Sequence, residues 1–227
     1  MNIKTTTIQE TDIKGWVDSA NRIGTALVLD IMDGLGRRQQ ALDMGIEPRA
    51  SQRTVIGSAK TLLWMDFAHE DQSTYELELK AVDSLLPHEV VVCATANSGR
   101  SGIWGELLTT AAMRRGAAGV VTDGAVRDIA QMQGMGFPVY SRFLSPYDSF
   151  NRQKVVAYDV MVEIDGVTIR PADVIVADLD GVAIVPQEIA PDILRLALEK
   201  ADREDRFRDA VRNGSSLTEA YQKYNVL

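Results

Sequence analysis

The sequence predicts a mixed α/β fold with a parallel strand–helix–strand core and a helical extension at its carboxyl end. Residues 90–95 form a continuous apolar run, which is typical of a strand covered on both faces. From there to residue 141 strand patterns alternate with helix patterns, which favours a parallel sheet with right-handed crossovers. After Pro146 the pattern changes to short strands joined by Asp-Gly turns, followed by a long charged helix.

The first part of the chain is predicted to be largely helical. The first forty residues have helical patterns, and residues 25–33 place apolar side chains at helical spacing before Gly34 and Gly36. Residues 55–64 are predicted to form a strand. Residues 73–85 mix apolar and charged side chains as an amphipathic helix does, and Pro87 ends this pattern.

The central part predicts three strands and two helices. We expect strands at 90–95, 118–122 and 137–141, a glycine-rich loop at 97–102, and helices at 105–115 and 128–133. The first of these helices ends in two arginines and Gly116, which is a favourable carboxyl-terminal cap. Asp123-Gly124 is predicted to turn the chain.

The last part predicts two hairpins and two helices. Residues 155–164 and 167–170 flank one Asp-Gly turn, and residues 174–177 and 182–185 flank another. Helices are expected at 190–212 and 216–224. The chain has no internal repeat and no linker-like segment, so we predict one domain over residues 1–227. Its core is expected at about 25–186 and its helical tail at about 188–227.

Composition excludes several classes of partner. The 227 residues carry a formal net charge of −8, which gives no electrostatic footprint for nucleic acid or an anionic membrane. No stretch approaches 18 apolar residues and the first residues are not a secretory leader, so a cytoplasmic protein is expected. Cys93 is predicted to be a buried small hydrophobe, and His69 and His88 are predicted to lie on the surface. Because the net charge is negative, an anionic substrate would need a local cationic group or a bound metal.

The glycine-rich loop before the helix at 105–115 is the first candidate site. At the carboxyl end of a parallel strand, the free amides of a helix start and the helix dipole favour an anion. The amides concerned are those of residues 105–108. An ordinary strand-to-helix turn explains the same pattern.

The second candidate site is Arg127-Asp128, which follows the next parallel strand and should reach the same sheet edge. A guanidinium there can hold a carboxylate in a fork, and a carboxylate can hold a divalent cation. In the alternative reading, Asp128 caps the short helix and Arg127 forms a surface ion pair. Glu106 suits a helix start for dipole reasons alone, but it could also face the same cation.

Residues 102–128, GIWGELLTTAAMRRGAAGVVTDGAVRD, resemble the signature of the RraA-like family. This family includes 4-hydroxy-4-methyl-2-oxoglutarate/4-carboxy-4-hydroxy-2-oxoadipate aldolases and regulators of ribonuclease E. Its motif is an acidic residue, twenty intervening residues and Arg-Asp, as in Glu106 and Arg127-Asp128. Residues 167–186 resemble a later strand pair of the family. Many members have Asp where this chain has Glu106, and Ala172 replaces a glycine.

The resemblance implies a metal-dependent class II type aldolase that cleaves a 4-hydroxy-2-oxo acid, with oxaloacetate decarboxylation as a side activity. Asp128 would ligate Mg²⁺ or Mn²⁺, and Glu106 would assist through water and take part in catalysis. Gly105, Arg127 and the backbone amides of Leu107 and Leu108 would bind the pyruvoyl group.

The resemblance further implies an αββα sandwich and a homotrimer or homohexamer, in which Glu204 of the tail completes a site across the interface. The alternative is a non-enzymatic regulator that binds a ribonuclease or another protein. A methyltransferase is set aside, because the chain lacks a glycine-rich nucleotide loop followed by an acidic ribose ligand.

Overall fold

The computed structural model describes residues 10–42 and 45–226. The helices are α1 (Glu10–Asp18), α2 (Thr25–Gly34), α3 (Glu76–Asp83), α4 (Glu106–Arg115), α5 (Ile129–Met135), α6 (Ala190–Arg212) and α7 (Leu217–Tyr224). The strands are β1 (Glu47–Pro48), β2 (Val55–Asp66), β3 (Glu89–Ala94), β4 (Gly102–Trp104), β5 (Gly119–Val126), β6 (Val139–Leu144), β7 (Gln153–Tyr158), β8 (Val162–Ile164), β9 (Val167–Ile169), β10 (Val174–Asp178) and β11 (Gly181–Val185).

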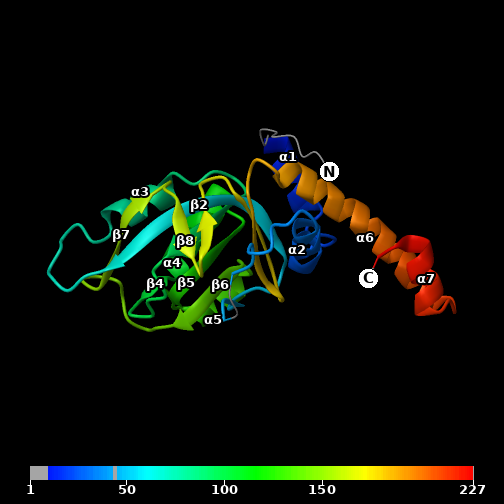
Figure 1. The fold of residues 1–227 in the computed structure, drawn as a ribbon. Helices are drawn as coiled ribbons and strands as arrows, with labels where there is room; N and C mark the ends of the chain where they lie inside the picture. The colour runs from blue at the N-terminus through cyan, green and yellow to red at the C-terminus, as the bar shows by residue number, and fades with distance from the viewer. Residues whose placement is uncertain (1–9, 43–44, 227) are drawn as a thin grey trace.

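A mixed sheet organises the described residues, in the order β1-β6-β5-β3-β2-β10-β11, with β4 paired to β5 and β7 paired to β2. Strands β2, β3, β5 and β6 run parallel, so their carboxyl ends meet at one edge. Strands β10 and β11 extend the sheet as an antiparallel hairpin. The predicted α/β class, with a parallel centre and a helical carboxyl-terminal extension, is confirmed (Figure 1).

The two faces of the sheet are covered differently. On one face, α3, α4 and α5 cover the parallel strands, and a hydrophobic cluster of even-numbered β2 side chains and their neighbours fills this layer. Helices α1, α2 and α6 cover the β10–β11 end of that face through a second cluster. On the other face, the β8–β9 hairpin packs against the sheet through a third cluster. The parallel strands are thus buried on both sides, as their continuous apolar runs require.

Two sequence predictions for the first half of the chain and its centre were wrong. Asp123-Gly124 does not turn the chain, because β5 continues from Gly119 to Val126. Asp123 instead lies within the buried strand, where its carboxylate accepts hydrogen bonds from the amides of Thr95 and Asn97. The amphipathic helix is also shorter than predicted, since α3 begins only at Glu76.

The hairpins were predicted in part. Strands β8 and β9 pair around Asp165-Gly166, and β10 pairs with β11, as expected. The predicted strand at 155–164 is divided, because residues 153–158 form β7, which pairs with the second half of β2. The prediction of helices in the first forty residues is confirmed for α1 and α2, while residues 1–9 lie outside the described residues.

Helix α6 has two unlike halves. Its buried residues all lie between Ala190 and Ala201, where it packs on α2 and the β10–β11 hairpin. The remaining turns and α7 extend away from the sheet as an arm, and after α7 the chain returns to lie beside α6 (Figure 1). A groove lined by α6 side chains and Val226 runs along this arm. None of the helices in the described ranges is long and apolar enough to cross a membrane.

Candidate functional site

The predicted site residues Arg127 and Asp128 come directly after β5, at the edge where the parallel strands end. Both side chains line a shallow cavity of about 310 Å³, together with Val126, Ile129, Leu144, Ser145 and Pro146. The Arg127 Nε and Asp128 Oδ2 atoms are 3.7 Å apart, and both side chains remain partly exposed, at 32% and 40%. A cationic and an anionic group therefore share one accessible cavity.

Asp128 does not act as a conventional helix cap. It occupies the position before α5, but its side chain makes no capping hydrogen bond to that helix. Its backbone has φ 58° and ψ 38°, a left-handed conformation that is unfavourable for most residues other than Gly, Asn and Asp. The carboxylate is directed instead toward α4, where Oδ2 accepts a hydrogen bond of 3.2 Å from the Glu106 amide. The capping alternative considered for Asp128 is thus excluded.

Two glycines allow this close approach of β4 and the start of α4 to the Arg-Asp pair. A Cβ atom on Gly105 would lie 2.5 Å from Asp128 Oδ2 and 3.2 Å from Arg127 Cγ. A Cβ atom on Gly102 would lie 2.5 Å from the Ser145 carbonyl oxygen and 2.9 Å from Arg127 Cβ. Since real Cβ contacts are longer than this, both positions require glycine.

Arg127 also pairs with a residue that was not predicted. Its Nη1 lies 2.8 Å from Asp148 Oδ2, in the loop after β6. Asp148 Oδ1 accepts hydrogen bonds from the Tyr75 hydroxyl and the Phe150 amide. Burial opposes ionisation of Asp148, but these hydrogen bonds and the Arg127 guanidinium outweigh it and lower the pKa of the carboxyl group. Burial and the Asp148 charge raise the pKa of Tyr75 to about 12. The network therefore fixes Arg127 with Asp148 ionised and Tyr75 protonated.

The start of α4 lies beside this pair. Gly105 is the extended residue before the helix, and Glu106 stands in its first turn. The amides of the first turn have no intrahelical acceptor, so those of Leu107 and Leu108 are available to an anion. Leu107 is 77% exposed, whereas Leu108 packs partly into the core. Glu106 Oε1 accepts a hydrogen bond of 2.8 Å from the Thr110 hydroxyl.

The carboxylates near the cavity are too few to coordinate a metal ion with protein ligands alone. The described residues contain no group of three or more His, Cys, Asp or Glu side chains that could hold a metal ion. Asp128 and Glu106 are joined through the Glu106 amide and remain partly exposed to solvent. One or two carboxylates with several waters is a donor set that Mg²⁺ accepts.

Glu204 does not lie at this cavity within one chain. It lies in the second half of α6, where its Oε1 is 3.7 Å from Lys200 Nζ, and it lines the groove of the arm. Lys200 also pairs with Asp30 of α2. The arm extends away from the part of the sheet that carries α4 and α5 (Figure 1).

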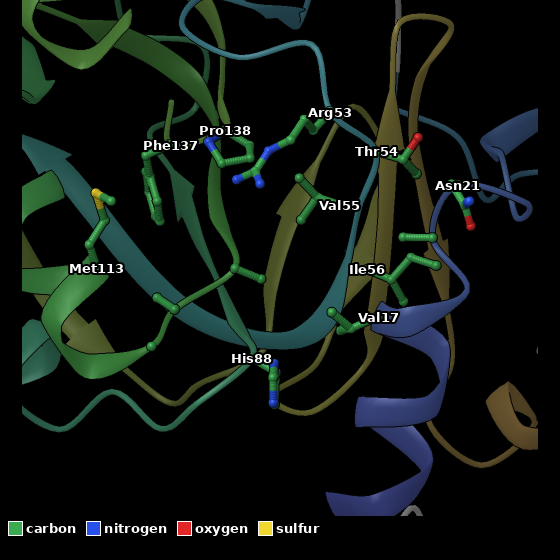
Figure 2. Close-up of a pocket in the computed structure, with 14 residues that line it drawn as sticks. Val17, Asn21, Arg53, Thr54, Val55, Ile56, His88, Met113, Phe137 and Pro138 are labelled. Atoms are coloured by element: carbon green, nitrogen blue, oxygen red, sulfur yellow. The ribbon is translucent and has the colours of Figure 1, made fainter. Parts of the chain in front are cut away.

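A larger cavity, of about 570 Å³, lies at the opposite ends of the parallel strands (Figure 2). It is lined by residues that precede or begin β2, β3, β5 and β6, by Val17 of α1 and the turn after it, and by Met113 near the end of α4. None of the predicted site residues lines it. Ligands of open parallel sheets bind beyond the carboxyl ends of the strands, so the smaller cavity is the better candidate for chemistry.

Three isolated predictions can be compared with the structure. His69 is exposed as predicted, and His88 is partly exposed where it lines the larger cavity. Cys93 is fully buried as predicted, and burial raises the pKa of its thiol.

Sequence reasoning missed Asp148 and Tyr75. Asp148 follows β6, the next parallel strand along the chain, so the argument that placed Arg127 at the sheet edge applies to it as well. Tyr75 lies just before α3 and reaches Asp148 across 73 residues of sequence. No local pattern indicates such a contact.

Several known proteins are similar to this chain over most of its length. The family model described as "RraA-like: Aldolase/RraA" matches residues 25–184. A protein of Halalkalibacterium halodurans named "Putative 4-hydroxy-4-methyl-2-oxoglutarate aldolase" is 32% identical over 187 residues, which cover 82% of this chain and 84% of that protein. Protein DlpA of Legionella pneumophila is 27% identical over 200 residues, which cover 88% of this chain and 32% of DlpA. This chain thus spans about a third of the length of DlpA.

One solved structure is similar to this chain over most of the length of both proteins. It is Streptomyces coelicolor RraAS2, described as an unusual member of the RNase ES inhibitor RraA protein family. The TM-score is 0.76 at 28% sequence identity, and the match covers 89% of this chain and 98% of that one.

Proposed function

Because this chain belongs to the RraA-like family, we propose that it is a carbon–carbon lyase acting on small 2-oxo acids. The reaction is the cleavage of a 4-hydroxy-2-oxo acid to pyruvate and a second carbonyl compound, with oxaloacetate decarboxylation as a side activity. The observation that carries the proposal is the presence of Arg127 and Asp128 in one cavity, beside the free amides of α4. The aldolase name of the H. halodurans relative supports it.

Arg127 and the start of α4 are proposed to bind the pyruvoyl group. The guanidinium presents a planar fork that matches a carboxylate, and Asp148 holds this fork in place. The amides of Leu107 and Leu108 donate toward the same anion, where the α4 dipole adds to the attraction. Gly105 keeps this approach free of side-chain atoms.

Asp128 and Glu106 are proposed to hold Mg²⁺ or Mn²⁺, Asp128 directly and Glu106 through water. The donor set fits such an ion, because both groups supply hard oxygen atoms and both remain partly exposed. The absence of a Cβ atom on Gly105 leaves the room that Asp128 Oδ2 occupies. When bound, the cation would withdraw electron density from the 2-oxo group and so favour an enolate product.

The complete site is proposed to form between subunits of a homotrimer or homohexamer. Two observations support this: one chain brings fewer than three acidic ligands to the cavity among its described residues, and Glu204 lies on an arm that leaves the body. Glu204 of one protomer would then complete the site of its neighbour.

A screen for pyruvate release tests the proposal. We expect the protein to release pyruvate from at least one 4-hydroxy-2-oxo acid when Mg²⁺ or Mn²⁺ is present, and to stop when EDTA is added. The assay couples pyruvate to lactate dehydrogenase over a panel of such acids, with oxaloacetate included. No turnover on any member of the panel with either metal would reject the lyase assignment.

The second candidate is a non-enzymatic regulator that binds a ribonuclease. The similarity to RraAS2, which is described as a member of a ribonuclease inhibitor family, favours it. This candidate predicts tight binding to a ribonuclease of the RNase E type and no 2-oxo-acid turnover even with metal.

Replacing Gly105 by alanine is expected to lower kcat/KM for pyruvate release by about tenfold or more while the chain still folds. The new methyl group would lie 2.5 Å from Asp128 Oδ2, so the carboxylate must move from its present position. Overpacking of this kind costs about 1–3 kcal/mol when the neighbour can shift. Activity and the urea unfolding midpoint should be measured together.

Gly134→Ala is the matched control for this variant. Gly134 lies in the nearby helix α5, and a Cβ atom added there would meet nothing within 4 Å. We expect it to leave activity unchanged and to stabilise the helix slightly. Equal activity of the two alanine variants would show that the room next to Asp128 is unimportant.

A further inference from the structure

Glu78 is a carboxyl group on the apolar face of a helix. In α3 the buried residues are Glu78, Ala81 and Val82, which share one face at helical spacing. Glu78 is 5% exposed. Within the described part of the chain its Oε2 atom is buried and has no hydrogen-bond partner. A hydrophobic residue would satisfy this position better, so the packing of α3 alone does not explain the carboxyl group.

The surroundings of Glu78 include the network that fixes Arg127. Asp148 and Arg127 both act electrostatically on Glu78, Asp148 against its ionisation and Arg127 in favour of it. Tyr75, one turn earlier, hydrogen-bonds to Asp148 and is itself influenced by Glu78. The thiol of Cys93, on β3, is influenced by Glu78 as well.

Two charged groups on the elements around α3 are engaged elsewhere, while α4 also carries Glu106 and Arg114, and β7 also carries Tyr158. On α4, Arg115 lies 3.7 Å from Asp83 at the far end of α3. On β7, Lys154 pairs with Asp71. Burial, and then the Asp148 charge, raise the pKa of Glu78 to about 8. At neutral pH the carboxyl group is therefore mostly uncharged.

We propose that Glu78 is a positioning residue of the Arg127 site, a buried carboxyl group that lets the Arg127–Asp148 pair accept a substrate carboxylate. This inference rests on the proposed function. With Glu78 uncharged, Arg127 and Asp148 form a pair without net charge, and the approach of an anion is not opposed. When Glu78 loses its proton, a second anion beside Asp148 acts on the guanidinium and competes with the substrate for its positive charge.

The test compares pyruvate binding in wild-type protein and Glu78→Gln across pH. With MgCl₂ present, the wild-type Kd for pyruvate is expected to rise by about three- to tenfold between pH 7 and 9.5. Glutamine has nearly the same shape and cannot ionise, so its Kd should stay constant over this range. Calorimetric titrations supply the Kd values.

Glu76→Gln is the matched control, because Glu76 lies on the same helix but is exposed and pairs with Lys80. It should follow the wild-type profile. Glu78→Leu provides a second uncharged side chain if the glutamine variant folds poorly, and it should give the same constant Kd. If the Kd of either Glu78 variant changes with pH as the wild-type Kd does, the role of Glu78 is overturned while the proposed function stands. Absence of pyruvate binding by wild-type protein at every pH overturns the proposed function, and the role of Glu78 with it.

A folding measurement examines the buried acid without any ligand. The folded protein keeps the Glu78 proton up to about pH 8, whereas the unfolded chain loses it near pH 4.5. The contribution of Glu78 to the free energy of unfolding therefore falls as pH rises between these values. The folding equilibrium constant of wild type, divided by that of Glu78→Gln, should therefore fall by up to tenfold per pH unit from about pH 5 to 8, and then level off. A constant ratio in urea titrations would show that Glu78 is not a buried neutral acid.

Discussion

Replacing Arg127 by alanine is expected to lower kcat/KM for pyruvate release by about a hundred- to a thousandfold. A charge-assisted, forked contact to a substrate carboxylate is worth about 3–4 kcal/mol when it is partly shielded from water, and each 1.4 kcal/mol is a factor of ten. Coupled assays at saturating Mg²⁺ give the rate constants.

Arg127→Lys separates charge from shape in the same experiment. Lysine keeps the positive charge beside Asp148 but cannot form the planar fork, so we expect an intermediate loss, mainly in KM. The alanine variant also leaves Asp148 without its cation, and for this reason its unfolding midpoint must be recorded with the kinetics. A rate near that of the wild type in a folded Arg127→Ala protein would remove Arg127 from the site.

Replacing Asp123 by alanine is expected to lower the free energy of unfolding by about 3–5 kcal/mol, because three hydrogen bonds to its carboxyl group are lost together. Asp123 is 1% exposed. Its Oδ1 accepts from the Thr95 amide at 2.7 Å and the Thr95 hydroxyl at 2.9 Å, and its Oδ2 accepts from the Asn97 amide at 2.7 Å. Alanine would leave the buried amide and hydroxyl of Thr95, and the amide of Asn97, without this acceptor.

Urea titration followed by tryptophan fluorescence measures this loss. Asp123→Asn keeps one side-chain acceptor and nearly the same volume, so its cost should be smaller, about 1–2 kcal/mol. A loss below about 1 kcal/mol in the alanine variant would mean that water replaces the carboxylate easily and that the loop after β3 is not fixed by Asp123.

The sequence predicted the fold class and family because the informative signals are local. The apolar run of β3, the glycine cap of α4 and the Glu106-to-Asp128 motif all lie within about forty residues, and the RraA-like resemblance is confirmed by the match to residues 25–184. The order of strands along the parallel centre follows from right-handed crossovers between neighbouring segments.

The parts that the sequence did not predict depend on contacts between distant segments. Asp123-Gly124 has the composition of a turn, but the hydrogen bonds that hold it in an extended strand come from Thr95 and Asn97 on the neighbouring loop. The contact of Tyr75 with Asp148, which orients Arg127, likewise joins two loops that no periodicity relates. Glu78 could not be singled out, because charged residues are ordinary in an amphipathic helix until the packing shows which face they occupy.

The left-handed backbone at Asp128 limits which mutations this position can accept during evolution. A β-branched residue would strain the chain before α5, whereas asparagine and glycine adopt this conformation readily. The substitutions that leave the scaffold intact are therefore also ones that delete the negative charge. Under the proposed function, such a substitution removes the cation ligand at little cost in folding, and a lineage of catalysts can become a lineage of binding proteins on an unchanged frame.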